Sequence, residues 1–272
     1  MLPLIKHLSE THLRLISALL LILILIIASR YPLLVFILTA IVLTIAVYEA
    51  AGLLKIAPLM RKMIAALSAM GSLFPILSWM MWSYLQILIG VSIIFLLSAY
   101  LAGFNQANMF MRFKKSTQML LFQMWLFFCM YCLVEFYLTP AGLFDISFII
   151  IIVAISDSSA WLIGRTLKGP KLIPSISPNK TWSGSIGALI CALLVGLLIN
   201  HYFFWQTITE TLIISAIITI SAQIGDLSIS FIKRKTNVKD TGNLIPGHGG
   251  ILDRIDGFLL ALPCAWSLNL WF

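Results

Sequence analysis

Apolar stretches of about 20 residues recur along the whole chain, and each is long enough for a helix to cross ~30 Å of hydrocarbon. The composition agrees, because 61% of the 272 residues are hydrophobic and only 10% are charged. A soluble domain carries roughly 25% charged residues. No long polar segment remains that could fold as a second, soluble domain. The sequence therefore predicts an all-α, polytopic integral membrane protein with one continuous membrane domain.

Charged residues, prolines and glycines divide these stretches into nine candidate helices. We expect them over residues 13–29, 32–54, 63–82, 84–104, 118–138, 143–164, 185–205, 208–232 and 250–271. The first run is longer than the apolar part of a usual signal peptide and lacks a small-residue cleavage site, so we expect a retained helix. Residues 1–117 would hold the first four helices, and residues 118–272 the five that carry the polar residues described below.

Lysine and arginine are concentrated in alternate loops between the expected helices. The intervening loops contain only Arg30. Because basic loops stay on the cytoplasmic side, this pattern predicts a cytoplasmic N-terminus, an external C-terminus and an odd number of helices. Basic loops beside anionic lipid headgroups also account for the net charge of +8 without a nucleic-acid partner.

Carboxylates inside apolar spans are costly, so they mark function by default. Glu49 and Glu135 are isolated, and for them we favour a structural role at a membrane surface or against a neighbouring helix. Four aspartates, in contrast, lie toward those ends of three expected helices that would face the cytoplasm. They are Asp157, Asp226, Asp253 and Asp256.

A glycine turn at Gly249 and Gly250 precedes two of these aspartates. Glycines let the backbone approach a ligand closely, and a helix N-terminus offers free N–H groups to an anion. Asp253 and Asp256 are three residues apart, so one helical face would carry both. Two hard oxygen ligands beside a phosphate site are suited to Mg²⁺ bound to a nucleotide.

Two further segments would bring polar groups to the same membrane surface. One is the helical face formed by Asp226, Ser230 and Lys233. The other combines Asp157 and Arg165 with a polar loop that contains Ser177, Lys180 and Thr181. Together they predict a cationic, metal-binding pocket for phosphates. Intramembrane aspartates and serines also line cation pathways in transporters, which is the alternative from a different class. Lys233 and the adjacent Arg234 would repel a permeating cation.

Residues 230–256, here called the signature segment, read Ser230-Phe231-Ile232-Lys233-Arg234-x₄-Lys239-Asp240-x-Gly242-x₂-Ile245-Pro246-x-His248-Gly249-Gly250-x₂-Asp253-Arg254-x-Asp256. This segment resembles the signature of the phosphatidate cytidylyltransferases (CDP-diacylglycerol synthases). The upstream runs Asp157-Ser158-x-Ala160-Trp161-x₂-Gly164-Arg165 and Ser177-Pro178-x-Lys180-Thr181 are similar to other blocks of that family. The resemblance is close in the C-terminal part of the chain and general in the N-terminal helices.

The resemblance implies that CTP and phosphatidic acid, or a related lipid phosphate, react in a prokaryotic cell membrane with release of pyrophosphate. It also implies an active site that faces the cytoplasm, Mg²⁺ with K⁺ as a second cation, and a homodimer. The implied metal ligands are Asp226, Asp253 and Asp256. The implied catalytic set adds Lys233, Arg234, Lys239, Asp240, His248 and Arg254, and the implied nucleotide-binding set is Asp157, Arg165, Ser177, Lys180, Thr181, Ser230, Gly249 and Gly250.

The sequence departs from the family pattern at three positions. Ser183 and Ile229 stand where a glutamate is common, and Gly257 stands where a serine is usual. These departures leave open a paralogue with an altered lipid substrate. A CTP-dependent polyprenol or phytol kinase has a similar Ser-Pro-x-Lys-Thr block but would release CDP. The spaced aspartates of the CDP-alcohol phosphotransferases are not found in this sequence.

Overall fold

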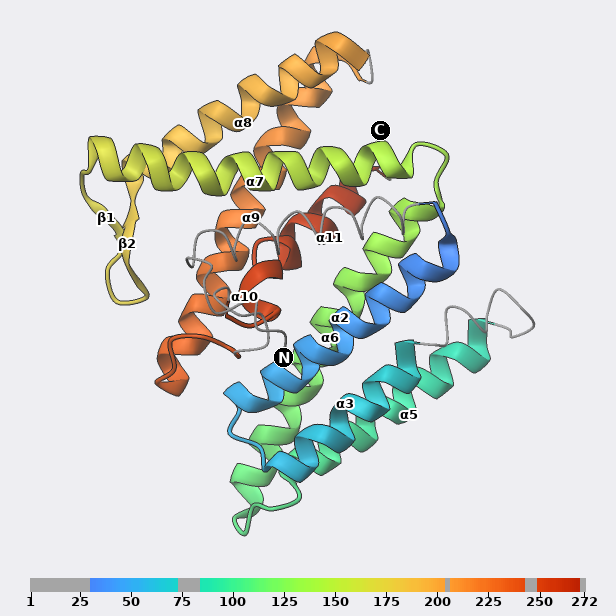
Figure 1. Cartoon of the computed structure of the whole chain (residues 1–272). Coiled ribbons are helices and arrows are strands. Elements are labelled where there is room, and N and C mark those ends of the chain that lie inside the picture. The colour runs from blue at the N-terminus through green and yellow to red at the C-terminus, as the bar shows by residue number, and fades with distance from the viewer. Residues whose placement is uncertain (1–29, 73–83, 204–205, 243–248, 270–272) are drawn as a thin grey trace, which may run out of the picture. The chain divides into compact units, whose positions relative to one another are not determined.

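The computed structural model describes residues 30–72, 84–203, 206–242 and 249–269 (Figure 1). The helix expected over 13–29 and the residue His248 lie outside the described residues. The chain divides into two compact units, Met1–Leu126 with Asp240–Arg254, and Phe127–Lys239 with Ile255–Phe272. Their boundary lies within one long helix, and the signature segment contributes to both units. The division at residue 117 stays a prediction.

The first unit is built from α2 (Pro32–Leu53), α3 (Pro58–Ser72), α5 (Tyr84–Gly103) and the beginning of α6 (Met109–Leu138). Helix α3 packs against α2 and against α5, and Figure 1 shows α3 and α5 side by side. The amide of Gln123 on α6 donates to the Ser68 hydroxyl of α3 at 2.9 Å. Pro32 stands in the first turn of α2, where no hydrogen-bond donor is needed.

The second unit contains α7 (Gly142–Leu167), α8 (Trp182–Phe203), α9 (Ile208–Thr236) and α11 (Phe258–Asn269). Helix α8 packs against α7 and α9, and α9 also packs against α11. The buried face of α8 carries small residues: Gly184, Gly187, Ala188, Ala192 and Gly196. Its opposite face exposes the large apolar side chains Ile186, Ile190, Leu194 and Leu198. Small residues inward and aliphatic residues outward are typical of a helix packed within a bilayer.

Local capping interactions mark both the start and the end of α9. The Thr207 hydroxyl accepts from the Glu210 amide, and the Glu210 carboxylate accepts from the Thr207 amide, which completes a capping box. At the other end Asn237 adopts a left-handed conformation with φ of 57°. Lys233, Arg234 and Lys235 occupy the last turn, where cations complement the helix dipole.

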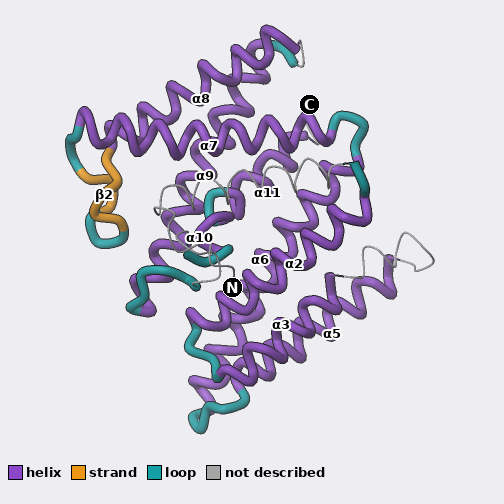
Figure 2. The backbone as a smooth tube through the Cα atoms, viewed as in Figure 1, coloured by secondary structure: helices purple, strands orange, loops and turns teal. Residues whose placement is uncertain are grey.

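A short antiparallel hairpin links α7 to α8 (Figure 2). Strand β1 (Lys171–Ile173) pairs with β2 (Ser177–Thr181), with Lys171 opposite Thr181 and Ile173 opposite Ser177. The sequence predicted a polar loop here and no strands. Two strands of three and five residues give too little alternation to recognise in a sequence.

Within the described residues, five helices are long and apolar enough to cross a membrane: α2, α6, α7, α8 and α9. The all-α membrane class is therefore confirmed, whereas nine spans and the orientation of the termini stay predictions. The bounds of α2, α5, α7, α8 and α9 lie close to those expected. Helix α3 begins at Pro58 instead of residue 63, and α6 begins at Met109 instead of residue 118.

The last expected helix, over residues 250–271, is wrong as a single element. The chain forms α10 (Leu252–Ile255), turns at Asp256 and Gly257, and resumes as α11. The Asp256 carboxylate accepts from the Gly257 amide at 2.8 Å. Such a local side-chain bond competes with the helical ladder and favours a turn. Asp253 and Asp256 consequently do not share one helical face, as the sequence analysis had expected.

Candidate functional site

A cavity of about 830 Å³ lies in the second unit, where α7, the hairpin, the start of α8 and the middle of α9 meet. Its volume falls in the range of ~300–1,000 Å³ that is usual for small-molecule sites. Six of the predicted site residues line it: Asp157, Arg165, Ser177, Lys180, Thr181 and Asp226. Lys168 and Lys171 line it as well, so four basic side chains face two acidic ones. The surplus of positive charge suits a phosphorylated ligand.

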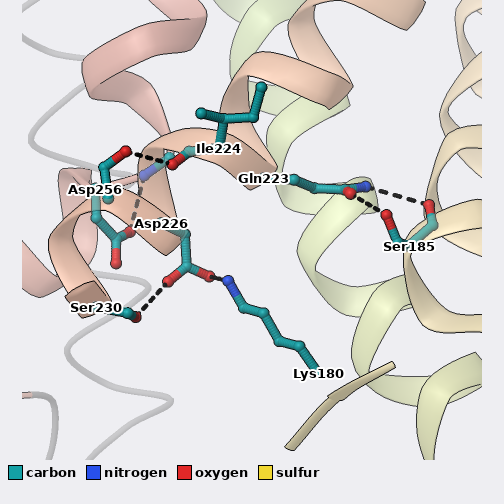
Figure 3. A network of polar contacts seen from close by, with 9 residues as sticks. Lys180, Ser185, Gln223, Ile224, Asp226, Ser230 and Asp256 are labelled. Atoms are coloured by element: carbon teal, nitrogen blue, oxygen red, sulfur yellow. Dashed lines mark hydrogen bonds and ion pairs between the residues drawn. The ribbon is translucent and has the colours of Figure 1, made fainter. Parts of the chain in front are cut away.

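Asp226 occupies the centre of the polar contacts in this wall (Figure 3). The Lys180 ammonium lies 2.5 Å from its Oδ2 atom, and the Ser230 hydroxyl donates to its Oδ1 atom at 3.3 Å. Ser230 is one helical turn from Asp226, as the sequence spacing predicted. Lys180 reaches Asp226 from strand β2. About 30% of each side chain in the ion pair is exposed, so solvent or a ligand can reach both groups.

Asp256 lies in the turn after α10, and Figure 3 shows it beside Asp226. Burial raises the pKa of Asp256 above its ordinary value, and the negative charge of Asp226 adds to the rise. The Gly257 amide and the Lys233 ammonium act in the opposite direction. A carboxyl group held in this way is stabilised in its ionised form by any cation that binds next to it.

Gly225 allows α9 to approach the turn that carries Asp256. A Cβ atom at this glycine would lie 2.4 Å from the backbone oxygen of Asp256 and 3.3 Å from that of Gly257. Real Cβ atoms do not come so close to backbone oxygens, so every residue larger than glycine would push the turn away from α9. The position of Asp256 beside Asp226 thus depends on the glycine that precedes Asp226 in the sequence.

Among the residues that the structure describes, no group of three or more His, Cys, Asp or Glu side chains could hold a metal ion. The available donors near the cavity are the hard carboxylate oxygens of Asp157, Asp226 and Asp256, and the Lys180 ammonium beside Asp226 shows that a positive charge is accommodated there. Mg²⁺ is commonly bound by one or two carboxylates together with substrate phosphates and water. The residues present fit that arrangement. The ligand set Asp226, Asp253 and Asp256, and the binding of K⁺, stay predictions.

In the first unit, the glycine turn does not offer its amides to a phosphate. The amides of Ile251 and Leu252 donate to the Glu49 carboxylate at 3.0 and 2.9 Å. The sequence analysis had favoured a simple structural role for Glu49 and an external anion at this turn. The anion that occupies the turn comes instead from α2 of the same chain. A partner more than two hundred residues away in the sequence could not be found from local patterns.

Asp253 is held by the same loop. Its Oδ2 atom accepts from the Thr241 amide at 2.8 Å, from the Thr241 hydroxyl at 2.9 Å and from the Gly250 amide at 3.2 Å. Gly249 adopts a φ of 80°, which favours glycine. Arg254 follows in α10.

The remaining predicted residues lie at the end of α9. Lys233 and Arg234 are in its last turn, and the Arg234 Nε atom donates to the backbone oxygen of Ile176 in the hairpin at 3.1 Å. Lys239 and Asp240 are exposed in the turn that follows. None of these four residues lines the described cavity.

One contact in the cavity wall was missed from the sequence. Gln223 and Ser185 bond to each other across α9 and α8, through the Ser185 hydroxyl and through the Gln223 amide, which donates to the Ser185 carbonyl at 3.2 Å (Figure 3). A glutamine three residues before Asp226 on an apolar helix was the available signal. Ser183, where the family usually has glutamate, instead donates its hydroxyl to the Lys168 carbonyl.

Comparison with known proteins identifies the group to which the chain is related. The sequence profile of the Cytidylyltransferase family matches residues 12–272, which is nearly the whole chain. The chain belongs to this family. The resemblance found in the sequence is thereby confirmed.

Several relatives carry the name phosphatidate cytidylyltransferase. The protein of Rickettsia prowazekii (strain Madrid E) is 45% identical over 123 residues, which are 42% of this chain and 54% of the relative. The protein of Rickettsia bellii (strain RML369-C) is 46% identical over 121 residues, 42% of this chain and 52% of the relative. That of Brucella abortus biovar 1 (strain 9-941) is 43% identical over 122 residues, 45% of each chain. The chain spans about half the length of the relatives it matches.

Proposed function

We propose that this protein transfers CMP from CTP to phosphatidic acid, and so forms CDP-diacylglycerol and pyrophosphate. The observation that carries the proposal is the cationic cavity around the Lys180–Asp226 pair in a member of the Cytidylyltransferase family. The names of the relatives support the same reaction. The substrates are a soluble nucleotide and a lipid, which agrees with a cavity built from apolar helices long enough to cross a membrane.

In this reaction an oxygen of the lipid phosphate attacks the α-phosphorus of CTP. A new P–O bond forms, and the bond between the α-phosphorus and the oxygen leading to the β-phosphate breaks, so pyrophosphate leaves with the electron pair. A phosphate monoester is largely ionised at neutral pH, so the attack needs no strong general base. The work of the protein is therefore to position two anions and to neutralise their charge.

The basic side chains Arg165, Lys168, Lys171 and Lys180 would bind the triphosphate, and the Ser177 and Thr181 hydroxyls face the same space. A bound Mg²⁺ would withdraw charge from the phosphates and from the leaving pyrophosphate. Asp226 and Asp256 would hold that ion. Ser230 fixes Asp226 through the bond to its Oδ1 atom and leaves the Oδ2 side to a cation.

A shallow groove beside Asp157 suits the lipid substrate. It is lined by Ser158, Trp161 and Leu162, and the last two side chains are 63% and 55% exposed. Asp157 borders both this groove and the cavity. An exposed apolar wall at a membrane-spanning helix can accept acyl chains while the phosphate reaches the basic side chains. Because Ser183, Ile229 and Gly257 differ from the family pattern, a related lipid phosphate is the second candidate substrate.

The proposal includes a cytoplasmic active site, since CTP is a cytoplasmic nucleotide and basic residues gather at this end of the helices. They are Lys168, Lys171 and Lys180 in and beside the hairpin, and Lys233, Arg234 and Lys235 in the last turn of α9. It also includes nine spans, a cytoplasmic N-terminus, an external C-terminus and residence in a prokaryotic inner membrane. A homodimer is proposed on the family resemblance alone.

The deciding assay uses CTP labelled at either the α- or the γ-phosphorus, with the purified full chain, phosphatidic acid and Mg²⁺. Transfer of the α-label to the lipid with release of pyrophosphate supports the proposal. Transfer of the γ-label with release of CDP would identify a lipid kinase. If neither label reaches phosphatidic acid or another lipid phosphate, and vesicles containing the protein conduct cations, the enzyme proposal is wrong.

Replacing the Asp226 carboxylate by an amide should remove most of the turnover. We expect Asp226→Asn to lower kcat by about a hundredfold or more, because it removes a charge that positions the reacting phosphates or their cation. Glu210→Gln is the matched control, since it makes the same chemical change on the same helix but in the exposed capping box at the other end. Turnover of Asp226→Asn within twofold of the unaltered protein would refute the role assigned to Asp226.

A further inference from the structure

The carboxylate of Glu49 is buried and hydrogen-bonded, although the sequence predicts for it, as for Glu135, no more than a structural role. The side chain lies near the end of α2 and is 5% exposed. It accepts from the amides of Ile251 and Leu252, as described above, and from the Thr241 hydroxyl at 2.9 Å. A buried charge is tolerated only where such bonds replace its water. The three donors all belong to the signature segment.

Two glycines of that segment leave room for this carboxylate. A Cβ atom at Gly242 would lie 2.6 Å from Glu49 Oε1, and a Cβ atom at Gly250 would lie 2.5 Å from Glu49 Oε2. At Gly242 all three nearest atoms belong to the Glu49 side chain. Neither glycine has a positive φ, whereas Gly249 between them does. At Gly250 the Thr241 hydroxyl is closer still to such a Cβ atom, at 2.2 Å. Space for Glu49 at Gly242, and for Glu49 and Thr241 together at Gly250, therefore favours glycine at these positions, and backbone conformation does not.

Thr241 connects Glu49 to Asp253. The Thr241 hydroxyl lies 2.9 Å from Glu49 Oε2 and 2.9 Å from Asp253 Oδ2. A hydroxyl has one hydrogen, so it donates to one carboxylate at a time, yet its position depends on both. The Thr241 amide adds a bond of 2.8 Å to Asp253. A displacement of Glu49 would therefore move Thr241 and, with it, Asp253.

We propose that Glu49 is a positioning residue, which holds the glycine turn of the signature segment around its carboxylate and orients Asp253 through Thr241. The inference rests on the proposed function, in which the family resemblance gives Asp253 a catalytic role. It assigns a purpose to an acidic side chain outside the resemblance, on a helix that the resemblance describes only in general terms. It also accounts for the two amides of Ile251 and Leu252, which donate to a carboxylate of the same chain.

The first part of the proposal, that the Glu49 carboxylate holds the glycine turn, is tested by amide hydrogen exchange, which does not depend on enzyme activity. In Glu49→Gln the amide nitrogen of the new side chain would face a backbone N–H, so at least one of the two bonds from Ile251 and Leu252 is lost. Hydrogen bonds to a charged group are strong enough that we expect exchange of these two amides to accelerate by on the order of tenfold to a hundredfold. Amides of α8 should exchange as before. Unchanged exchange at Ile251 and Leu252 would overturn the proposal.

The second part of the proposal, that Thr241 orients Asp253, is tested by turnover. The variants to compare are Thr241→Val and Thr241→Ser. Valine keeps the shape and the amide bond to Asp253 but removes the hydroxyl, and serine retains it. We expect the valine variant to lower kcat about tenfold while KM for CTP stays within about twofold, because the loss of one such bond is worth roughly that factor. Serine should restore kcat. Equal kcat values for the valine and serine variants would overturn the proposal, and this comparison still decides if Glu49→Gln does not fold.

A double substitution gives a further check on the contact between Gly242 and the Glu49 side chain. Gly242→Ala should destabilise the unaltered chain because its Cβ meets Glu49, but should cost little in a Glu49→Ala background, where that space is empty. Equal destabilisation in both backgrounds would contradict the proposed contact. If the unaltered protein transfers no label from CTP, the proposed function fails, whereas the exchange and stability measurements still report on Glu49.

Discussion

Lys180 has two possible partners: Asp226, with which it forms an ion pair, and the phosphates of a bound nucleotide. Lys180 now neutralises Asp226 at 2.5 Å, and it lines the cavity in which we propose that the triphosphate binds. The single positive charge of the ammonium group, shared between a carboxylate and a phosphate, neutralises each of them less than it would neutralise one alone. Binding of CTP would draw Lys180 toward the phosphates and leave Asp226 free for a cation. Nucleotide and Mg²⁺ should therefore bind with positive coupling.

Lys180→Met tests this coupling by removing the charge while keeping much of the apolar chain. We expect the Kd for CTP, measured by calorimetry in the presence of Mg²⁺, to rise about tenfold or more, since a charge-assisted bond to phosphate is lost. Mg²⁺ alone should bind more tightly than to the unaltered protein, because Asp226 has lost its internal partner. Lys180→Arg is the control, and it should retain the coupling. Weaker binding of Mg²⁺ alone to Lys180→Met would contradict the exchange of partners.

The contacts predicted from sequence at the residue scale are those that one helix imposes. Asp226 and Ser230 are four residues apart, and the structure joins them by a hydrogen bond. Lys180 and Asp226 were assigned to one pocket, but their direct contact depends on the hairpin. The bonds from Glu49 to Ile251 and Leu252 could not be predicted, because they depend on tertiary packing and not on any local spacing.

At the scale of elements, the closest backbone approach near the site is that of α9 to the turn between α10 and α11. The three atoms nearest to a Cβ at Gly225 are all backbone atoms of Asp256 and Gly257. Backbone cannot rotate away as a side chain can, so the contact tolerates only glycine. By contrast, a Cβ at Gly257 would meet Val153 at 3.4 Å and Ala222 at 3.7 Å, which are ordinary contact distances.

Gly225→Ala and Gly257→Ala form a matched pair for this contact. We expect Gly225→Ala to destabilise the protein by about 1–3 kcal/mol or to displace the turn, as overpacked substitutions do. Gly257→Ala should stay within about 0.5 kcal/mol, since it adds a methyl group where there is space. Thermal unfolding in detergent measures both. A melting temperature for Gly225→Ala equal to that of Gly257→Ala would show that α9 lies farther from the turn.

The elements that were predicted well are those with long uniform patterns. Helices α7, α8 and α9 lie within a few residues of their expected bounds, because a run of apolar residues between charged or glycine-rich segments defines a span. The hairpin and the break between α10 and α11 were not predicted. Both are short, and both depend on contacts with α9: that of the Ile176 carbonyl with Arg234, and that of the Asp256 turn with Gly225.

At the scale of the whole molecule, the proposed function requires that a water-soluble nucleotide and a membrane lipid reach one cavity. Helix α7 lines the cavity near one end and is a candidate membrane span, so its other end would lie at the opposite membrane surface. It has 26 residues, and at a rise of 1.5 Å per residue a helix of that length exceeds the ~30 Å of hydrocarbon. The hairpin at one end is basic, and the turn at Pro140 and Ala141 at the other end carries no charge. This asymmetry is the basis of the proposed orientation.

Labelling of single cysteines in whole cells would test that orientation. In a chain from which Cys129, Cys132, Cys191 and Cys264 have been replaced, Asn179→Cys places a thiol on the exposed hairpin and Ala141→Cys places one on the exposed turn before α7. A maleimide that does not cross membranes should react with Ala141→Cys in intact bacteria and with Asn179→Cys only after permeabilisation. The reverse pattern would put the cavity outside, where CTP is scarce, and would remove the basis for a cytidylyl transfer from the cytoplasm. Labelling of both thiols from the same side would mean that α7 does not cross the membrane, and the five long helices would then need another arrangement.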